Sequence, residues 1–230
     1  MEPGAVFDGS GQVHRPPCGS LVKEAWSLLF YRPAPPSVEG LSQGEGRPVL
    51  VLPAALTKDS ATRPLRRLAR CGFRAHPWNL GLNWGPTPAL RAGLRRRLLD
   101  LHASEGAPIA LLGVSMGGLL ARDLAHDHPE SVRQVVTVAS PFRLPTATTL
   151  APIFRALWRR YDPAVDLARL ARPLLVPAMA ICTRHDGIVA WRNCVSDDPS
   201  CPTVELTGAH LTLCRDPRAL RAIAARLAED

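Results

Sequence analysis

The chain has 230 residues, of which 46% are hydrophobic and 21% charged, and its formal net charge is +8. This length is enough for one α/β domain with a substantial core, and there is no apolar run of roughly eighteen residues that could insert stably into a membrane. The basic residues are spread over helical segments rather than interleaved with aromatic side chains, which argues against a nucleic-acid-binding module.

Residues 1–47 are predicted to be an N-terminal extension and linker, rich in Pro and Gly, with a short amphipathic helix at 21–31. No basic start followed by an apolar core is present, so we expect no secretory signal, a cytoplasmic location and reduced thiols. Cys194 and Cys201 flank an Asp-Asp-Pro loop. They are expected to pair only if the protein meets an oxidising compartment.

From residue 48 onward, strand and helix patterns alternate. Strands are expected at 48–53, 73–78, 108–113, 132–139, 173–183 and 202–206, and helices at 59–70, 89–105, 116–128 and 216–229. Continuous apolar strands such as 48–53 are typical of a parallel sheet that is buried on both faces. The alternation therefore predicts an α/β fold with a mostly parallel central sheet and helices on both faces, in a domain spanning 48–230.

A serine pattern lies between the strand at 108–113 and the helix that follows it. The letters GVSMG match G-x-S-x-G, with apolar runs on both sides. In a strand-turn-helix setting this pattern is a nucleophile elbow, which holds Ser115 in a strained conformation and lifts its hydroxyl above the sheet. Gly113 and Gly117 are needed there because a Cβ atom would collide where strand and helix cross.

The segment 140–172 interrupts the alternation because no strand is predicted in it. Its amphipathic stretch carries Phe154, Leu157 and Trp158. An insertion at this place in such folds lies over the carboxyl ends of the strands. We therefore expect a small helical lid whose three large apolar side chains face the pocket, and the alternative is an ordinary crossover helix packed on the sheet.

A serine nucleophile needs a base and an acid that orients the base, in the chain order serine, acid, histidine for this type of fold. Asp186 follows an apolar strand and precedes Gly187, and His210 lies in a Gly-Ala-His turn after the last strand. Four other acids do not combine a preceding strand with a following Gly: Asp162, Asp166, Asp197 and Asp198. The other histidines lie outside the required order, near a helix end or beside the acid: His14, His76, His102, His126, His128 and His185.

The developing negative charge of such a reaction needs two backbone N–H donors. Met116 supplies one because it follows the nucleophile. The loop after the strand at 48–53 is expected to supply the other from Ala55, with Leu56 beside it lining the substrate pocket.

These segments together resemble bacterial α/β-hydrolase fold esterases and lipases. The resemblance spans roughly 48–214 and rests on PVLVLPAAL, WNLGLNWGPT, GVSMGG, TRHDGIVAW and GAHLTL. It implies Ser115, Asp186 and His210 as a catalytic triad. It also implies hydrolysis of small-molecule carboxylic esters through an acyl-enzyme, with no cofactor and no metal.

Two positions depart from the family pattern, namely Ala54 in place of the usual Gly and Ala209 in place of the usual Ser before the histidine. They bear on efficiency and substrate preference more than on mechanism. The same triad serves acyltransferases, thioesterases and amidases, so other acyl chemistry is the alternative within the fold. The alternative outside it is a non-catalytic binding protein. Acyl-chain length and oligomeric state are left open.

Overall fold

The computed structural model describes residues 16, 19–30 and 40–229, apart from the side chains of Leu28 and Trp158. In this part of the chain, six strands form one sheet in the order β2-β1-β3-β4-β5-β6, and every neighbouring pair is parallel. The strands are β1 (Pro48–Leu52), β2 (Arg74–Pro77), β3 (Ile109–Val114), β4 (Val132–Val138), β5 (Ala178–Cys182) and β6 (Thr203–Glu205). The predicted α/β class is confirmed.

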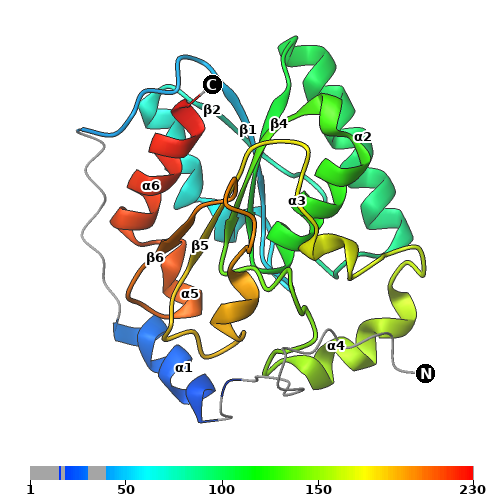
Figure 1. Cartoon of the computed structure of the whole chain (residues 1–230), viewed down its shortest axis with the longest axis vertical. Helices are drawn as coiled ribbons and strands as arrows, with labels where there is room; N and C mark the ends of the chain where they lie inside the picture. The colour runs from blue at the N-terminus through cyan, green and yellow to red at the C-terminus, as the bar shows by residue number, and fades with distance from the viewer. Residues whose placement is uncertain (1–15, 17–18, 31–39, 230) are drawn as a thin grey trace.

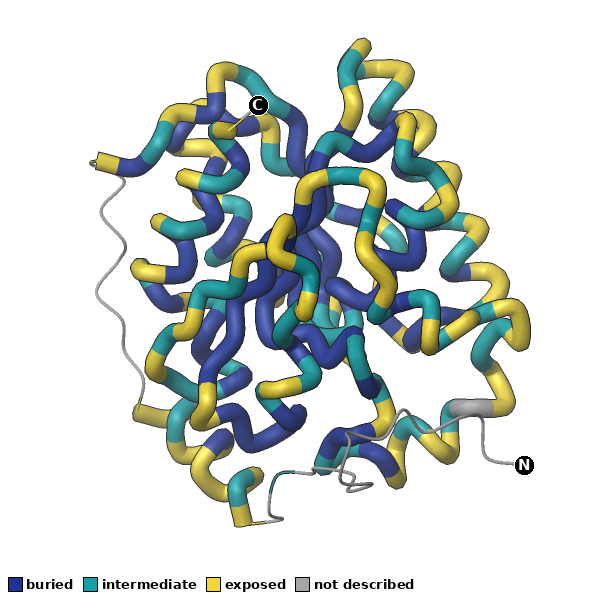
Figure 2. Tube along the Cα trace, viewed as in Figure 1, coloured by how far each residue is buried: buried dark blue, intermediate teal, exposed yellow. Residues whose placement is uncertain are grey.

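The helices cover both faces of this sheet (Figure 1). The α-helices are α1 (Ser20–Phe30), α2 (Pro88–Glu105), α3 (Met116–Asp127), α4 (Ala151–Leu157), α5 (His210–Leu213) and α6 (Pro217–Ala228), and two 3-10 helices, η1 (Asp59–Thr62) and η2 (Leu65–Cys71), precede β2. Alternate residues of β1 divide the core, since successive side chains of a strand point to opposite faces. Val51 belongs to the same core cluster as Ile223 of α6, whereas Leu52 belongs to the cluster that contains Leu98 of α2. The inner strands β1, β3, β4 and β5 are therefore buried on both sides, whereas the edge strands β2 and β6 are partly exposed (Figure 2).

The single helix predicted over 59–70 is wrong, because this segment forms η1 and η2 instead. Pro64 lies between them and has no N–H to donate to a continuing helix. Asp59 does not cap a helix, and its carboxylate accepts a hydrogen bond from the N–H of Trp78 at 3.0 Å. Gly72 ends η2 with a φ of 80°, as a C-terminal glycine does.

The strand predicted at 173–183 is shorter, since β5 begins at Ala178. Pro173 and Pro177 occur in the part that is not a strand, and a proline cannot donate to a central ladder. The preceding loop leaves Leu175 87% exposed.

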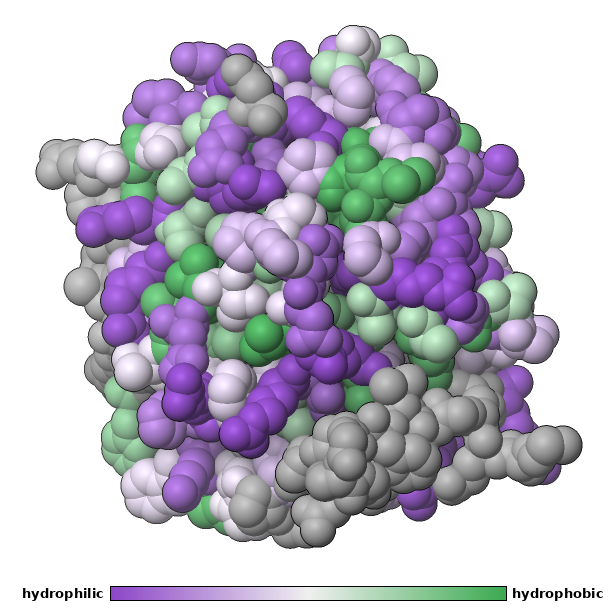
Figure 3. All heavy atoms as spheres, viewed as in Figure 1, coloured by the Kyte–Doolittle hydropathy of each residue, from purple (hydrophilic) through white to green (hydrophobic). Residues whose placement is uncertain are grey.

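Most of the face shown in Figure 3 is hydrophilic. Among the described helices, none combines the length and the apolar character that crossing a bilayer requires.

The segment 140–172 contains α4, which lies near the carboxyl ends of the strands in Figure 1. Near its start, the Thr148 hydroxyl donates to the carbonyl of Ile188 at 2.8 Å. Near its end, Asp162 accepts from the guanidinium of Arg91 at 2.7 Å. The segment is thus fastened to the body of the domain on both sides of α4, and its action as a lid stays a prediction.

The helix expected at 21–31 is present as α1, and it packs against α5. These two helices lie together in the lower part of Figure 1, although α1 comes early in the chain and α5 near its end. Much of the segment 1–47 lies outside the described residues, so its separation from the domain at 48–230 stays a prediction.

Candidate active site

Ser115 lies between β3 and α3 in a strained backbone conformation, with a φ of 51° and a ψ of −118°. Its N–H donates to the carbonyl of Val138 at 2.8 Å, which fixes the turn against β4. A Cβ atom on Gly113 would lie 2.4 Å from the carbonyl oxygen of Gly117, and one on Gly117 would lie 2.4 Å from that of Leu52. Both glycines therefore permit the close crossing of strand and helix that the sharp turn requires.

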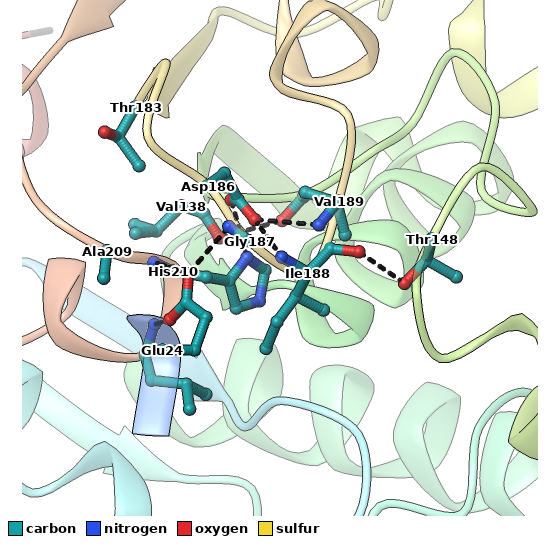
Figure 4. A network of polar contacts seen from close by, with 12 residues as sticks. Glu24, Val138, Thr148, Thr183, Asp186, Gly187, Ile188, Val189, Ala209 and His210 are labelled. Atoms are coloured by element: carbon teal, nitrogen blue, oxygen red, sulfur yellow. Dashed lines mark hydrogen bonds and ion pairs between the residues drawn. The ribbon is translucent and has the colours of Figure 1, made fainter. Parts of the chain in front are cut away.

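Asp186 lies in the loop after β5 and is 8% exposed. Its Oδ1 atom accepts hydrogen bonds from the N–H groups of Ile188 at 2.9 Å and Val189 at 2.8 Å. Its Oδ2 atom lies 2.7 Å from Nδ1 of His210 (Figure 4). One oxygen is thus held by the loop itself, which leaves the other directed at the histidine.

His210 is the first residue of α5 and is 3% exposed. An ionised carboxylate only accepts hydrogen bonds, so the 2.7 Å contact with Asp186 places the proton on Nδ1 and leaves Nε2 as the basic nitrogen. Burial disfavours the charged imidazolium, but the charges of Asp186 and Glu24 and the hydrogen bond to Asp186 outweigh it. The pKa of His210 is therefore raised above its ordinary value.

The four competing acids have other partners. Asp162 pairs with Arg91, Asp166 with Arg172, Asp197 with Arg143, and Asp198 accepts from Ser200. Among the described residues, no group of His, Cys, Asp and Glu side chains could hold a metal ion. The Cys194 and Cys201 thiols are free and buried, and burial raises the pKa of each.

The two predicted N–H donors come from separate parts of the chain. Met116 is the first residue of α3, and the first N–H groups of a helix have no acceptor within it. Ala55 lies in the loop after β1, where the N–H of the next residue, Leu56, is already bound to the carbonyl of Asn83 at 2.7 Å. Asn83 is fully buried, so it fixes one side of the loop that carries Ala55.

The Ala54 methyl group is accommodated without left-handed strain. A positive φ in this loop falls on Leu56, at 57°, and not on Ala54. Ala54 instead packs against the core cluster that contains Val51. The departure from glycine at this position is therefore compatible with the loop conformation.

The predicted pocket residues differ in exposure, and their grouping around one pocket stays a prediction. Leu56 is 39% exposed, and Phe154 and Leu157 on α4 are half-buried. The side chain of Trp158 lies outside the described part of the chain.

Sequence reasoning assigned no role to two residues that contact these loops, Asn83 and Glu24. Asn83 could have been found from the sequence, because it lies in the WNLGLNWGPT segment that carries the family resemblance. Glu24 could not, because an acid in an amphipathic helix is ordinarily exposed.

The parallel sheet and the turn between β3 and α3 are those of the α/β-hydrolase fold, and the chain has this fold. Residues 97–192, less than half of the chain, match the family described as "Serine aminopeptidase, S33". A match of 34% identity to the pimeloyl-[acyl-carrier protein] methyl ester esterase of Aeromonas hydrophila subsp. hydrophila covers 28% of this chain and 35% of that protein. The chain thus spans about a third of this curated relative.

Solved structures show the same fold over most of the chain. A pyrethroid hydrolase from Sphingobium faniae JZ-2 has a TM-score of 0.56 at 19% identity, with 79% of this chain and 97% of that chain covered. The mature lipase BlEst2 of Bacillus licheniformis has a TM-score of 0.59 at 11% identity, with 82% and 94% covered. Likenesses at this low identity establish the fold.

Proposed function

We propose that the chain hydrolyses carboxylic esters through Ser115, His210 and Asp186. The observation that carries this proposal is the buried 2.7 Å contact between Asp186 and His210, in a fold that also presents Ser115 on a strained elbow. A buried carboxylate bound to Nδ1 orients an imidazole for proton transfer at Nε2, which is the role of the acid in a serine triad.

The reaction proceeds in two halves. His210 Nε2 takes the proton of Ser115 Oγ, and this oxygen attacks the acyl carbon of the ester. The N–H groups of Met116 and Ala55 bind the tetrahedral oxyanion, and His210 then protonates the leaving alcohol. Water, activated by the same histidine, releases the carboxylic acid from the acyl-enzyme, and Asp186 stabilises the imidazolium that forms in each half.

The substrate is a small-molecule ester with an apolar acyl part. Leu56 and the α4 side chains Phe154 and Leu157 supply the apolar surface for it. The predicted contribution of Trp158 stays an expectation from the sequence. The similarity to an esterase, and to structures described as lipases and hydrolases, supports ester cleavage.

Amide hydrolysis is the second candidate, because the matching family is described as a serine aminopeptidase. The same three residues serve both reactions, since an acyl-enzyme forms from either an ester or an amide. The two candidates differ in the leaving group that His210 protonates, an alcohol or an amine. Paired substrates that share one acyl group and differ only in the leaving group separate them.

Labelling with a fluorophosphonate probe tests the nucleophile. We expect the wild-type chain to be labelled, Ser115→Ala to lose the label, and the exposed control Ser104→Ala to keep it. A panel of nitrophenyl esters of rising chain length, with matched nitroanilides, then tests the substrate class. A folded wild-type chain that takes no label rules out the serine mechanism, and turnover of nitroanilides alone rules out the ester assignment.

A further inference from the structure

A carboxylate is buried in the helix that precedes the sheet. Glu24 is 2% exposed, whereas on the same helix Val22 is 59%, Trp26 58% and Leu29 71% exposed. An amphipathic helix ordinarily buries its apolar face and leaves its acids in water. Burying a carboxylate is unfavourable unless hydrogen bonds compensate for the lost contact with water. The buried Glu24 side chain is therefore expected to have hydrogen-bond donors around it.

The partners of Glu24 are backbone N–H groups of the acid and base loops (Figure 4). Its Oε1 atom accepts from the N–H of Gly187 at 2.8 Å and from that of His210 at 2.9 Å. Its Oε2 atom accepts from the N–H of Leu211 at 3.1 Å. One side chain of α1 thus connects the residue after Asp186 with His210 itself.

Gly187 and Ala209, one in each of the two loops, both favour the hydrogen bonds of the Glu24 carboxylate. A Cβ atom on Gly187 would lie 2.6 Å from the carbonyl oxygen of Ser20 and 2.8 Å from Cγ of Glu24, so only glycine lets α1 approach so closely. Ala209 precedes α5 and has no side-chain oxygen to accept from the first N–H groups of that helix. Glu24 accepts from two of them instead.

We propose that Glu24 is a positioning residue, which holds the loop of Asp186 and the loop of His210 in register for the reaction. This inference rests on the proposed function. It makes α1 a part of the active site, whereas the sequence predicted that this helix belongs to an N-terminal extension and linker. A second contact joins the same two loops, since the Thr183 hydroxyl donates to the carbonyl of Gly208 at 2.8 Å. Glu24 differs from that contact because it carries a charge and binds the backbone of His210 directly.

Two consequences distinguish this role from a merely structural one. The buried Glu24 carboxylate is bound to backbone N–H groups through both of its oxygens, so we expect its loss to lower kcat while KM stays nearly constant. Its negative charge favours the imidazolium form of His210 and helps to raise the pKa of that group, although burial and Asp186 act on it more strongly. Loss of the charge therefore moves the acid limb of the activity profile to lower pH.

The decisive variant is Glu24→Gln, which keeps the shape but loses the charge and gives one oxygen for three donors. We expect kcat for a nitrophenyl ester to fall roughly 10- to 100-fold, as for a small misplacement of catalytic groups, with KM within about twofold. The matched control is Glu45→Gln, the same chemical change at an exposed carboxylate. An unchanged kcat and pH profile in folded Glu24→Gln overturns the proposal.

Hydrogen exchange tests the contact without any activity. In the full wild-type chain, the N–H groups of Gly187, His210 and Leu211 should exchange slowly, and Glu24→Gln should accelerate exchange at these three sites relative to β3 and β4. Gly187→Ala, which pushes α1 away, should do the same. Rapid exchange of the three groups in the wild type overturns the proposal, even if no variant folds. A wild type that takes no fluorophosphonate label but shows this protection removes the proposed function and leaves the contact in place.

Discussion

Asn83 and Pro53 are joined by a buried hydrogen bond, in which the Asn83 side-chain amide donates to the Pro53 carbonyl at 2.7 Å. The amide oxygen of Asn83 accepts from the N–H of Gly85 at 3.0 Å, and its backbone carbonyl accepts from Leu56. All the polar groups of Asn83 named here are thus engaged with backbone. The residue fixes the loop whose Ala55 N–H is proposed to bind the oxyanion.

Asn83→Ala should therefore weaken both the fold and the reaction. The Pro53 carbonyl loses its donor in a buried place, which costs about 1–3 kcal/mol of unfolding free energy, measured by urea denaturation. Loosening of the loop should lower kcat for a nitrophenyl ester. Gln43→Ala removes an exposed amide and should stay within about 0.5 kcal/mol of the wild type. Equal stability of the two variants contradicts the role of Asn83.

The raised pKa of His210 predicts the acid limb of the pH profile. His210 must be neutral to act as a base, so kcat/KM should fall as the pH drops through a value above the ordinary 6.5. Because the pKa is higher in the folded state, His210 contributes stability that is fully present below its unfolded pKa and is lost as the pH rises through its folded pKa. A limb centred below 6.5 in the wild type contradicts the charge arrangement.

Asp186→Asn tests the acid of the pair. The asparagine keeps the size but removes the charge, so the pKa of His210 should fall and the histidine should lose its fixed tautomer. We expect kcat to drop by a factor on the order of 10⁴, as for this substitution in other serine triads. Asp197→Asn, at an exposed acid 80% accessible to solvent, is the control and should keep its activity. A small effect of Asp186→Asn would indicate that another acid serves His210.

Gly117→Ala should destabilise the elbow strongly. The added Cβ atom would lie 2.4 Å from the Leu52 carbonyl oxygen, which belongs to the backbone of a central strand and is unable to yield. Overpacking of this kind costs about 1–3 kcal/mol or more, measured by denaturation. In Gly93→Ala the new Cβ meets only the end of the Leu80 side chain, at 3.2 Å. That control lies within α2 and should be neutral or more stable by up to about 1 kcal/mol.

Arg91→Met should destabilise the contact between α2, α3 and the segment after α4. Arg91 binds Asp123 at 2.9 Å and Asp162 at 2.7 Å, and burial raises the pKa of Asp123 although Arg91 opposes the rise. Without Arg91 the buried Asp123 loses its main counter-charge, at a cost of about 3 kcal/mol. The control is Arg95→Met at an exposed position on the same helix.

The pH dependence of this loss has a definite sign. A raised pKa in the folded state means that the folded chain holds the Asp123 proton more tightly than the unfolded chain does. Stability contributed by the protonated acid is therefore present at low pH and is lost as the pH rises. The deficit of Arg91→Met relative to the wild type should grow between about pH 4 and pH 8. A deficit that shrinks over this range contradicts the pairing.

Much of the fold follows from local patterns. Continuous apolar runs give the strands β1 and β3 because both faces of a parallel sheet are buried. The elbow glycines follow from sterics within a few residues of Ser115. The exceptions also have local causes, since Pro64 replaces one predicted helix by two short ones and Pro177 precedes the late start of β5.

Parts of the candidate site could not be predicted from local sequence patterns. The contact between Asp186 and His210 joins two predicted residues, but their catalytic roles, the lid and the cytoplasmic location stay predictions. Glu24 lies in a helix whose pattern places acids in water, and its partners are more than 160 residues away in the chain. Three backbone N–H groups hold the Glu24 carboxylate in its buried position. The sequence does not indicate which backbone N–H groups will be available as such partners.

The separation between Glu24 and its partners has a consequence for the order in which the protein is made. Glu24 is synthesised 186 residues before His210. Closing the intervening chain has an entropic cost that nascent β1 to β5 must first offset by forming the sheet. The arrangement around His210 is therefore completed only after all six strands and α5 have been synthesised, so nascent chains that end before α5 lack the assembled site.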